Sequence, residues 1–414
     1  MPTRLGLKSH PHPGRPLASN RPLPLLQLVS RYGLFLTVLV CVVAFAAHWR
    51  DALRFNKHED LFIYRAGSVI GLQGRTPYDN AALRELVVAQ YPDDPLFANN
   101  LGFFLPPQAI VVFAPFALLP WVVAKYVWAV LTIVLTALAA RRVGVFASSP
   151  TPAWLAPAFV FVVLLSPIVV TSMIVGQTSA LVFACIALGE VAYRAGWKRL
   201  AGFLWAVPFI KPHLALPLLP LAWYLGGWRR AAELLLWLVG LNLVGCLLST
   251  GSPLLIRDYL DYLATGHTAV VFNRVETNPH ITSWNRLVVA AGGPAIELSA
   301  LGVLAGYAVW GLAVLARVRI ARSRPSPAWA VAVAFAAAPV VCQVMGYELT
   351  LLALVVPHVL DLFAAGRVRT AFLILMGLAL AWAPFAVGEL LPSHRAIGAV
   401  WVAVVVLIGG WSRT

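Results

Sequence analysis

The sequence predicts an all-α polytopic membrane protein, and three observations support this fold class. Hydrophobic residues occupy 60% of the 414 positions, and charged residues occupy only 11%. The mean hydropathy is +0.82, and apolar runs recur along the whole chain. In lipid, a backbone can satisfy its hydrogen bonds only within helices or closed barrels, and runs of this length indicate helices. Basic residues gather on alternate connecting segments, as they do on the cytoplasmic side of membrane proteins.

The apolar runs define about 12 (10–13) predicted transmembrane helices. Their approximate limits are 32–48, 106–140, 153–173, 177–193, 200–210, 212–226, 231–249, 296–316, 327–345, 348–364, 371–388 and 397–411. The stretch 106–140 would be about 50 Å long as one helix, and Pro115 and Pro120 are predicted to break it. The stretch 200–226 is short for two spans, because a full crossing needs about 20 residues.

The charge distribution predicts how these helices are oriented. With the N-terminus inside, the inner segments carry nineteen of the 31 basic residues but only three of the 16 acidic ones. Both termini are therefore predicted to be cytoplasmic. Residues 1–31 are predicted to form a flexible basic tail, because no cleavage pattern follows the first apolar run. Residues 32–411 are predicted to form a single integral membrane domain, and the net charge of +15 indicates orientation rather than nucleic-acid binding.

Two predicted outer loops, about 50–105 and 250–295, are too long to be simple turns. The first contains the segment LRELVVAQY, in which Leu83, Leu86 and Val87 have helical spacing. This spacing predicts short helices that lie along the membrane surface.

Glu59 and Asp60 lie side by side where the chain leaves the first predicted helix, in the stretch FNKHEDLFIYRAG. Taken alone, Asp60 is either a solvated carboxylate or the N-cap of a helix over LFIYRAG. The motifs that follow change this interpretation. They are Tyr64 and Gly67, then GLQGRTPYD (71–79), FFLPPQAIVVFAPFALLP (103–120), VGQTSALVFACIALG (175–189) and FIKPHLALPLLP (209–220).

In the order and spacing of these motifs, roughly residues 55–350 resemble glycosyltransferase family 87. The shared pattern is D-x-x-x-Y, then G-x-x-PY-D, a span that opens with PP and later contains LP, then GQ and KP. This family contains integral-membrane sugar transferases of the GT-C class, including polyprenyl-phosphate-mannose-dependent mannosyltransferases. The resemblance implies a GT-C-type helix bundle with a large first extracytoplasmic loop. It also implies hexosyl transfer from a polyprenyl-phosphate sugar to a glycolipid or cell-envelope glycan.

The resemblance further implies that Asp60 is the general base of this transfer. An acceptor hydroxyl is a poor nucleophile, and a carboxylate within hydrogen-bond reach can take its proton as the new C–O bond forms. Such a group must lie at the level of the lipid headgroups, where the first outer loop is predicted to place Asp60. Glu59 is the local competitor, although adjacent residues in a helical turn point in different directions.

The departing lipid phosphate needs cationic partners, and Lys211 and Arg286 are the predicted donor-phosphate residues. Lys211 is a charge inside an apolar stretch, which makes it a functional candidate, with a snorkelling anchor as the alternative. Arg286 follows TNPHITSWN in the second outer loop, where a plain loop is the alternative. His213 either shares the Lys211 site or has a structural role.

The other candidates are predicted to bind the sugar or the acceptor: Glu59, Tyr64, Gln177, His213, Asn278, His280, Trp284, Tyr347 and Glu348. Gln177 either hydrogen-bonds a sugar hydroxyl or caps a helix. Near Tyr347, the mannosyltransferase branch of the family tends to have Ser-Pro followed by His. This sequence instead has Pro339 and then VVCQVMGYE, which leaves the identity of the donor sugar open.

The lipid-linked sugar is the predicted donor substrate, and neither a metal ion nor another cofactor is indicated. The four cysteines lie in apolar runs and lack the spacing of a metal site or disulfide framework. The alternative function is a transporter or flippase of a lipid-linked sugar in the same membrane. A proton-coupled transporter should place acids near mid-span, whereas Glu190, Glu233 and Asp361 lie near predicted helix ends. The active site of the predicted transferase faces the outside of the cell membrane.

Overall fold

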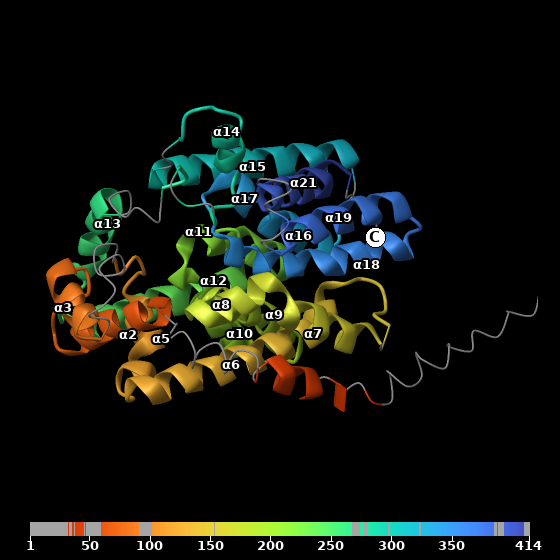
Figure 1. Cartoon of the computed structure of the whole chain (residues 1–414). Helices are drawn as coiled ribbons and strands as arrows, with labels where there is room; N and C mark the ends of the chain where they lie inside the picture. The colour runs from red at the N-terminus through yellow and green to blue at the C-terminus, as the bar shows by residue number, and fades with distance from the viewer. Residues whose placement is uncertain are drawn as a thin grey trace, which may run out of the picture.

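The computed structural model describes residues 59–90, 102–152, 154–266, 281–296, 299–322, 324–384 and 393–409, with scattered positions in 32–46 and 274–280 and at 387. Within these ranges the chain is helical, with no strand longer than an isolated bridge such as the one between Ile281 and Met345. Many of the helices pack side by side in one elongated bundle (Figure 1). The predicted tail and parts of both long loops lie outside the described residues.

The helices in chain order are α2 (Glu59–Leu72), α3 (Asn80–Gln90), α5 (Gln108–Ala117), α6 (Trp121–Arg142), the 3₁₀ helix η1 (Val143–Phe146), α7 (Leu155–Leu165), α8 (Pro167–Val175), α9 (Ser179–Arg194), α10 (Lys198–Ala206), η2 (Val207–Ile210), α11 (Pro212–Ala215), α12 (Leu218–Leu248), α13 (Leu255–Gly266), α14 (Trp284–Ala290), α15 (Ala300–Ala321), α16 (Pro327–Ala336), α17 (Ala338–Val341), η4 (Gly346–Val355), α18 (Val356–Ala364), α19 (Val368–Ala381) and α21 (His394–Gly409). The leucine and valine spacing in the first outer loop correctly predicted a short helix, which is α3.

Four segments of the described chain are long and apolar enough to cross a membrane: α6 with η1, α12, α15, and η4 with α18. The pair α7 and α8, bent by 54° at their junction, is a fifth if it counts as one span. On α15 the large apolar side chains point outward, and Leu301 and Ile320 are 78% and 74% exposed. Long helices with exposed apolar faces indicate a membrane protein. The count of about 12 spans stays a prediction.

Proline ends the long helix that the stretch 106–140 would otherwise form. The break lies between α5 and α6, and Pro120 is the N-cap of α6. A proline there costs no backbone hydrogen bond, because the first N–H groups of a helix have no partner within the helix. Pro115 lies inside α5 without ending it. The predicted break is confirmed, and Pro120 is the residue that makes it.

The stretch 200–226 is broken at Lys211. Its φ and ψ of −121° and 79° are not helical, and they separate η2 from α11, which starts at Pro212. A second break lies at Gly227, whose φ of 70° is one that side-chain-bearing residues rarely adopt. The chain is therefore kinked within α12, between the predicted segments 212–226 and 231–249.

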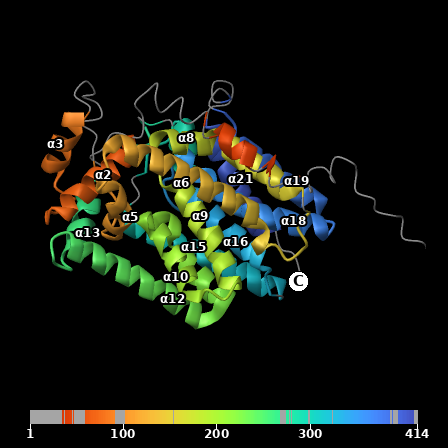
Figure 2. The ribbon, with the colours of Figure 1, turned by 90° about the horizontal axis from the view of Figure 1, so that it is seen from below.

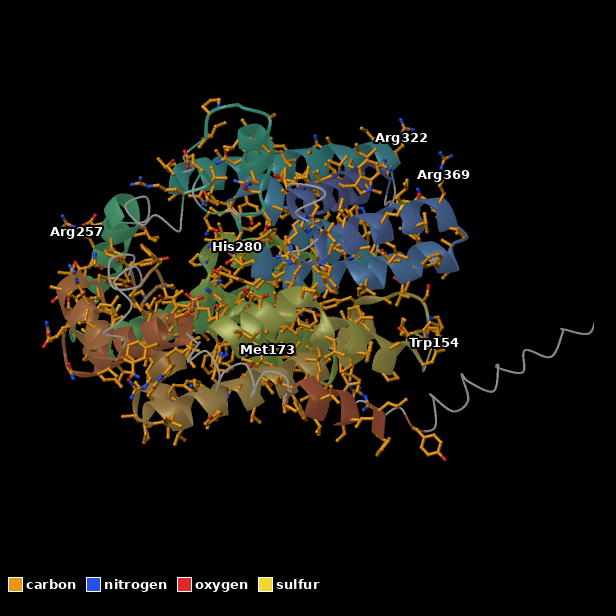
Figure 3. All side chains as sticks on the ribbon, viewed as in Figure 1. Trp154, Met173, Arg257, His280, Arg322 and Arg369 are labelled. Atoms are coloured by element: carbon orange, nitrogen blue, oxygen red, sulfur yellow. The ribbon has the colours of Figure 1, made fainter. Side chains whose placement is uncertain are left out.

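Residues from predicted inner and outer segments project from different ends of the bundle. α8 and α9 both pack against η4, and in Figure 2 α8 lies along the upper edge while α10 lies near the lower one. Figure 3 shows Arg322 and Arg369 projecting from one end and Arg257 from the other. The first two belong to predicted inner segments and the third to a predicted outer loop, so these segments lie at opposite ends of the bundle.

Candidate active site

Asp60 lies in the first turn of α2, directly after Glu59, and both side chains are half-buried. A carboxylate is stabilised there because the unpaired N–H groups give a helix N-terminus a partial positive charge. The rest of α2 is mostly buried, including Tyr64 one turn further along. Asp60 is therefore an ordered helical residue with a defined neighbourhood rather than a freely solvated carboxylate.

Gln177 connects Asp60 to the rest of the site. Its side-chain Nε2 donates to Asp60 Oδ2 at 2.7 Å and to the Tyr347 hydroxyl at 3.0 Å. Its Oε1 accepts from the Tyr64 hydroxyl at 3.0 Å. Gly176 makes this possible, because its φ of 74° ends α8 and turns the chain toward α9. The Gln177 amide thus joins α2 to η4, and its contact with a sugar hydroxyl stays a prediction.

A buried ion pair lies beside this network. Lys211 Nζ donates to Glu348 Oε1 at 2.6 Å, and His213 Nε2 lies 3.5 Å from the same oxygen. The Lys211 ammonium also lies 5.1 Å from the centre of the Tyr347 ring, which places a cation on the face of that ring. The second oxygen of Glu348 accepts from the Met345 backbone N–H at 2.9 Å.

The two groups form one polar cluster within an apolar bundle. Lys211 is 5% exposed and Glu348 is 6% exposed, so each charge depends on the other for compensation. Lys211 was predicted as a cation for a lipid phosphate. In the structure its charge is already paired with Glu348. His213 contacts the pair, so the interpretation in which it shares the Lys211 site is favoured.

The environment of Asp60 suits proton abstraction. Burial raises the pKa of its carboxyl from the ordinary 3.8 to about 6. The hydrogen bond from Gln177 and the charge of Lys211 oppose this change, whereas the charges of Glu59 and Glu348 add to it. A carboxylate with a pKa near 6 is ionised at neutral pH and is a stronger base than an ordinary aspartate.

The second predicted loop contributes to the same region by its backbone. The Gly346 N–H donates to the His280 carbonyl at 2.7 Å, and Ile281 forms the bridge with Met345. Asn278 Nδ2 donates to the Met345 sulfur, a weak acceptor, at 3.7 Å. These contacts place Asn278 and His280 next to the segment that carries Tyr347.

Among the described residues, neither Trp284 nor Arg286 contacts this polar cluster. Trp284 begins α14, and the Arg286 guanidinium donates to the Val275 carbonyl at 3.1 Å. That bond lies within the second predicted outer loop, and the phosphate contact of Arg286 stays a prediction.

Sequence reasoning missed the buried cation Arg395, which lies beside Gly346. Its Nε and Nη2 donate to the Ala383 carbonyl, and its Nη1 lies 3.0 Å from the point where a Cβ on Gly346 would be. Burial lowers the pKa of His280, and the charge of Arg395 lowers it further. Its position in SHRAIG, at the start of an apolar run and far from the motifs, gave no signal beyond a basic residue near a predicted helix end.

The arrangement brings together a carboxylate of raised pKa, two tyrosine hydroxyls, an amide and a buried lysine–glutamate pair. These groups come from four parts of the chain: α2, the turn after α8, the break between η2 and α11, and η4. They can accept a proton, bind hydroxyl groups and place a cation near an anionic leaving group.

Comparison with known proteins identifies the family. The profile of glycosyltransferase family 87 matches residues 103–345, more than half of the chain. Gln177, Lys211 and His213 lie within the match, Asp60 and Tyr64 lie before it, and Tyr347 and Glu348 follow it directly. No curated protein matches the chain. The chain therefore belongs to glycosyltransferase family 87.

Proposed function

We propose that this membrane glycosyltransferase transfers a hexose from a polyprenyl-phosphate donor to a lipid or cell-envelope glycan on the extracytoplasmic face, with Asp60 as general base. The observation that carries the proposal is the contact between Asp60 and Gln177, which holds a carboxylate of raised pKa beside the Lys211–Glu348 pair. Mannose is tested first because the family includes polyprenyl-phosphate-mannose-dependent enzymes, and glucose is tested beside it because the segment before Tyr347 departs from the pattern of those enzymes.

In the proposed reaction, the acceptor oxygen attacks the anomeric carbon of the donor sugar. The bond between that carbon and the phosphate oxygen breaks, and its electron pair leaves with the polyprenyl phosphate. The acceptor proton passes to Asp60 as the new glycosidic bond forms. The Lys211 ammonium has N–H groups beyond the one given to Glu348, and these can donate to the departing phosphate. Tyr64 and Tyr347 are proposed to orient hydroxyl groups of the sugar or acceptor.

The donor class is tested with purified protein in proteoliposomes. Radiolabelled polyprenyl-phosphate mannose, polyprenyl-phosphate glucose and the matching nucleotide sugars are supplied in parallel with membrane lipid extract. We expect a new glycosidic product, detected by chromatography and mass spectrometry, from a polyprenyl-phosphate sugar and none from nucleotide sugars. A nucleotide-sugar product would contradict the donor class. Label that crosses the bilayer without a new glycosidic bond would favour the transporter or flippase.

The pH dependence of transfer should report the ionisation of Asp60. We expect kcat/KM to fall about tenfold per pH unit below about pH 6, because only the ionised carboxylate accepts the proton. Gln177→Leu removes an N–H donor to the carboxylate, so the pKa of Asp60 should rise and the acid limb should move up by about one unit.

The matched control is Tyr347→Phe, which removes a hydroxyl from Gln177 but leaves the bond from Gln177 to Asp60. Its acid limb should stay in place. An acid limb that does not move in Gln177→Leu, in a protein that still transfers sugar, would show that Asp60 is not the group titrating.

A further inference from the structure

A cavity of about 770 Å³ lies where α9, α10 and α12 meet. Side chains around it include Tyr193, Lys198, Trp205, Trp228, Arg229 and Arg230. α9 starts two residues after Gln177 and runs 16 residues to Arg194, a length of about 24 Å at 1.5 Å per residue. The cavity therefore lies a full helix length from Asp60, and α10 and α12, which line it, run near the lower edge of the bundle in Figure 2.

One side of the cavity is formed by Arg230, whose guanidinium is held in place by two aromatic rings and an ion pair. The Arg230 guanidinium lies 4.0 Å from the centre of the Tyr193 ring and 3.8 Å from that of Trp205. Its Nη2 donates to Glu190, which also accepts from Arg194 at 2.9 Å. Gly226 is required here, because a Cβ at this position would lie 2.6 Å from the Arg230 side chain.

Two further cations face the cavity without this compensation. Lys198 and Arg229 are exposed, and neither forms a salt bridge among the residues that the structure describes. Arg229 lies 5.7 Å from the centre of the Trp228 ring. Glu233 also lines the cavity, and its negative charge offsets only one of the two positive charges of Lys198 and Arg229. The lining therefore keeps an excess of positive charge and suits an anion.

The surroundings indicate that the anion carries an apolar portion. Leu236 lines the same cavity and is 71% exposed, and Trp228 is 68% exposed. Trp197 and Trp223 are also exposed, at 65% and 67%, and lie on the segments that border the cavity. Exposed tryptophan beside lysine and arginine is typical of the membrane–water interface on the cytoplasmic side. A water-soluble phosphate ester carries no apolar chain that could pack against the exposed Leu236.

We propose that this cavity binds the phosphate headgroup of an anionic phospholipid, at the end of the bundle opposite the sugar-transfer site. Lys198 and Arg229 supply the charge, Arg230 with its two rings forms the fixed wall, and the acyl chains lie against Leu236. The chemistry recognised is a phosphate monoanion on an apolar anchor, which basic pockets between membrane helices commonly bind.

The test measures lipid binding by the detergent-purified full chain. Phosphatidylglycerol, phosphatidylcholine and glycerol 3-phosphate are titrated separately, and bound molecules are counted by native mass spectrometry. Phosphatidylglycerol is expected to bind with preference over the other two ligands. Lys198→Gln and Arg229→Gln should each weaken its binding about fivefold, and the double variant about 25-fold, since each basic residue contributes about equally.

The matched control is Arg257→Gln, at an exposed arginine that does not line the cavity and projects from the left end of the bundle in Figure 3. This substitution should leave binding unchanged. Lys198 and Arg229 are exposed, so neither substitution is expected to disturb folding, and each single variant is informative alone. Equal binding by wild type and double variant would overturn the proposal. It would also be overturned if phosphatidylcholine or glycerol 3-phosphate bound as tightly as phosphatidylglycerol.

Discussion

Replacing Asp60 with asparagine is expected to lower the rate of sugar transfer by about 10²–10⁴-fold, the usual contribution of a general base. Asparagine keeps the size of the side chain and an oxygen that can accept the Gln177 hydrogen bond, but it cannot take a proton at neutral pH. Donor binding should persist, because Asp60 acts on the acceptor. The measurement is kcat/KM for transfer, together with donor-lipid binding by the same purified protein.

The Asp60→Asn variant should fold as well as the wild type. Folding raises the pKa of Asp60, so its contribution to stability is full below the unfolded value of 3.8 and is lost as the pH rises through about 6. At pH 7 the ionised carboxylate therefore costs stability, which a neutral side chain does not. Loss of activity in this variant can be assigned to chemistry once its melting temperature matches or exceeds that of the wild type.

Glu59→Gln is the matched control, since the two acids are adjacent and both half-buried. Its effect on transfer should be far smaller, because Gln177 contacts Asp60 and the Glu59 side chain projects elsewhere on α2. If Glu59→Gln abolished transfer while Asp60→Asn stayed within a few-fold of wild type, the wrong carboxylate would have been chosen. If neither change mattered, base-catalysed transfer at this site would be excluded.

The second large effect is a loss of folding stability when the buried Lys211–Glu348 pair is broken. Lys211→Met leaves the buried Glu348 carboxylate without its cation, and breaking a buried pair in this way costs about 3–5 kcal/mol. The double variant Lys211→Met with Glu348→Gln should recover most of this loss, because no uncompensated charge remains and the glutamine oxygen can still accept from the Met345 N–H. Thermal melts in detergent measure both. Lys198→Met, at an exposed lysine, is the control and should melt like the wild type.

The double variant separates structure from function. If it is stable but inactive, Lys211 and Glu348 act on the substrate, as the proposed phosphate contact requires. If it is stable and fully active, the pair only supports the fold, and Lys211 has no part in donor binding. A Lys211→Met variant that melts like the wild type would contradict the buried pairing itself.

Several features of the fold were predictable from the sequence because their causes are local. Pro120 and Pro212 lack the N–H that a continuing helix needs, and the chain breaks beside both, whereas Pro115 lies inside α5 without ending it. The hydropathy of the chain predicts helices in a membrane, and the charge asymmetry predicts which segments share an end. The motif order from Asp60 to the KP step at Lys211 indicated the family that the profile match confirms.

The site required tertiary structure because its contacts join residues far apart in the chain. Asp60 and Gln177 are separated by 117 positions, and Lys211 and Glu348 by 137, so no local pattern reports these contacts. Hydropathy marks Lys211 as a costly charge, but only packing shows that Glu348 already compensates it. The same holds for Arg395 beside Gly346, which packing alone identifies. The sequence by itself determined a helical membrane transferase and most of the polar residues involved, whereas their mutual distances, and hence which charges are paired, were decided by how the helices pack.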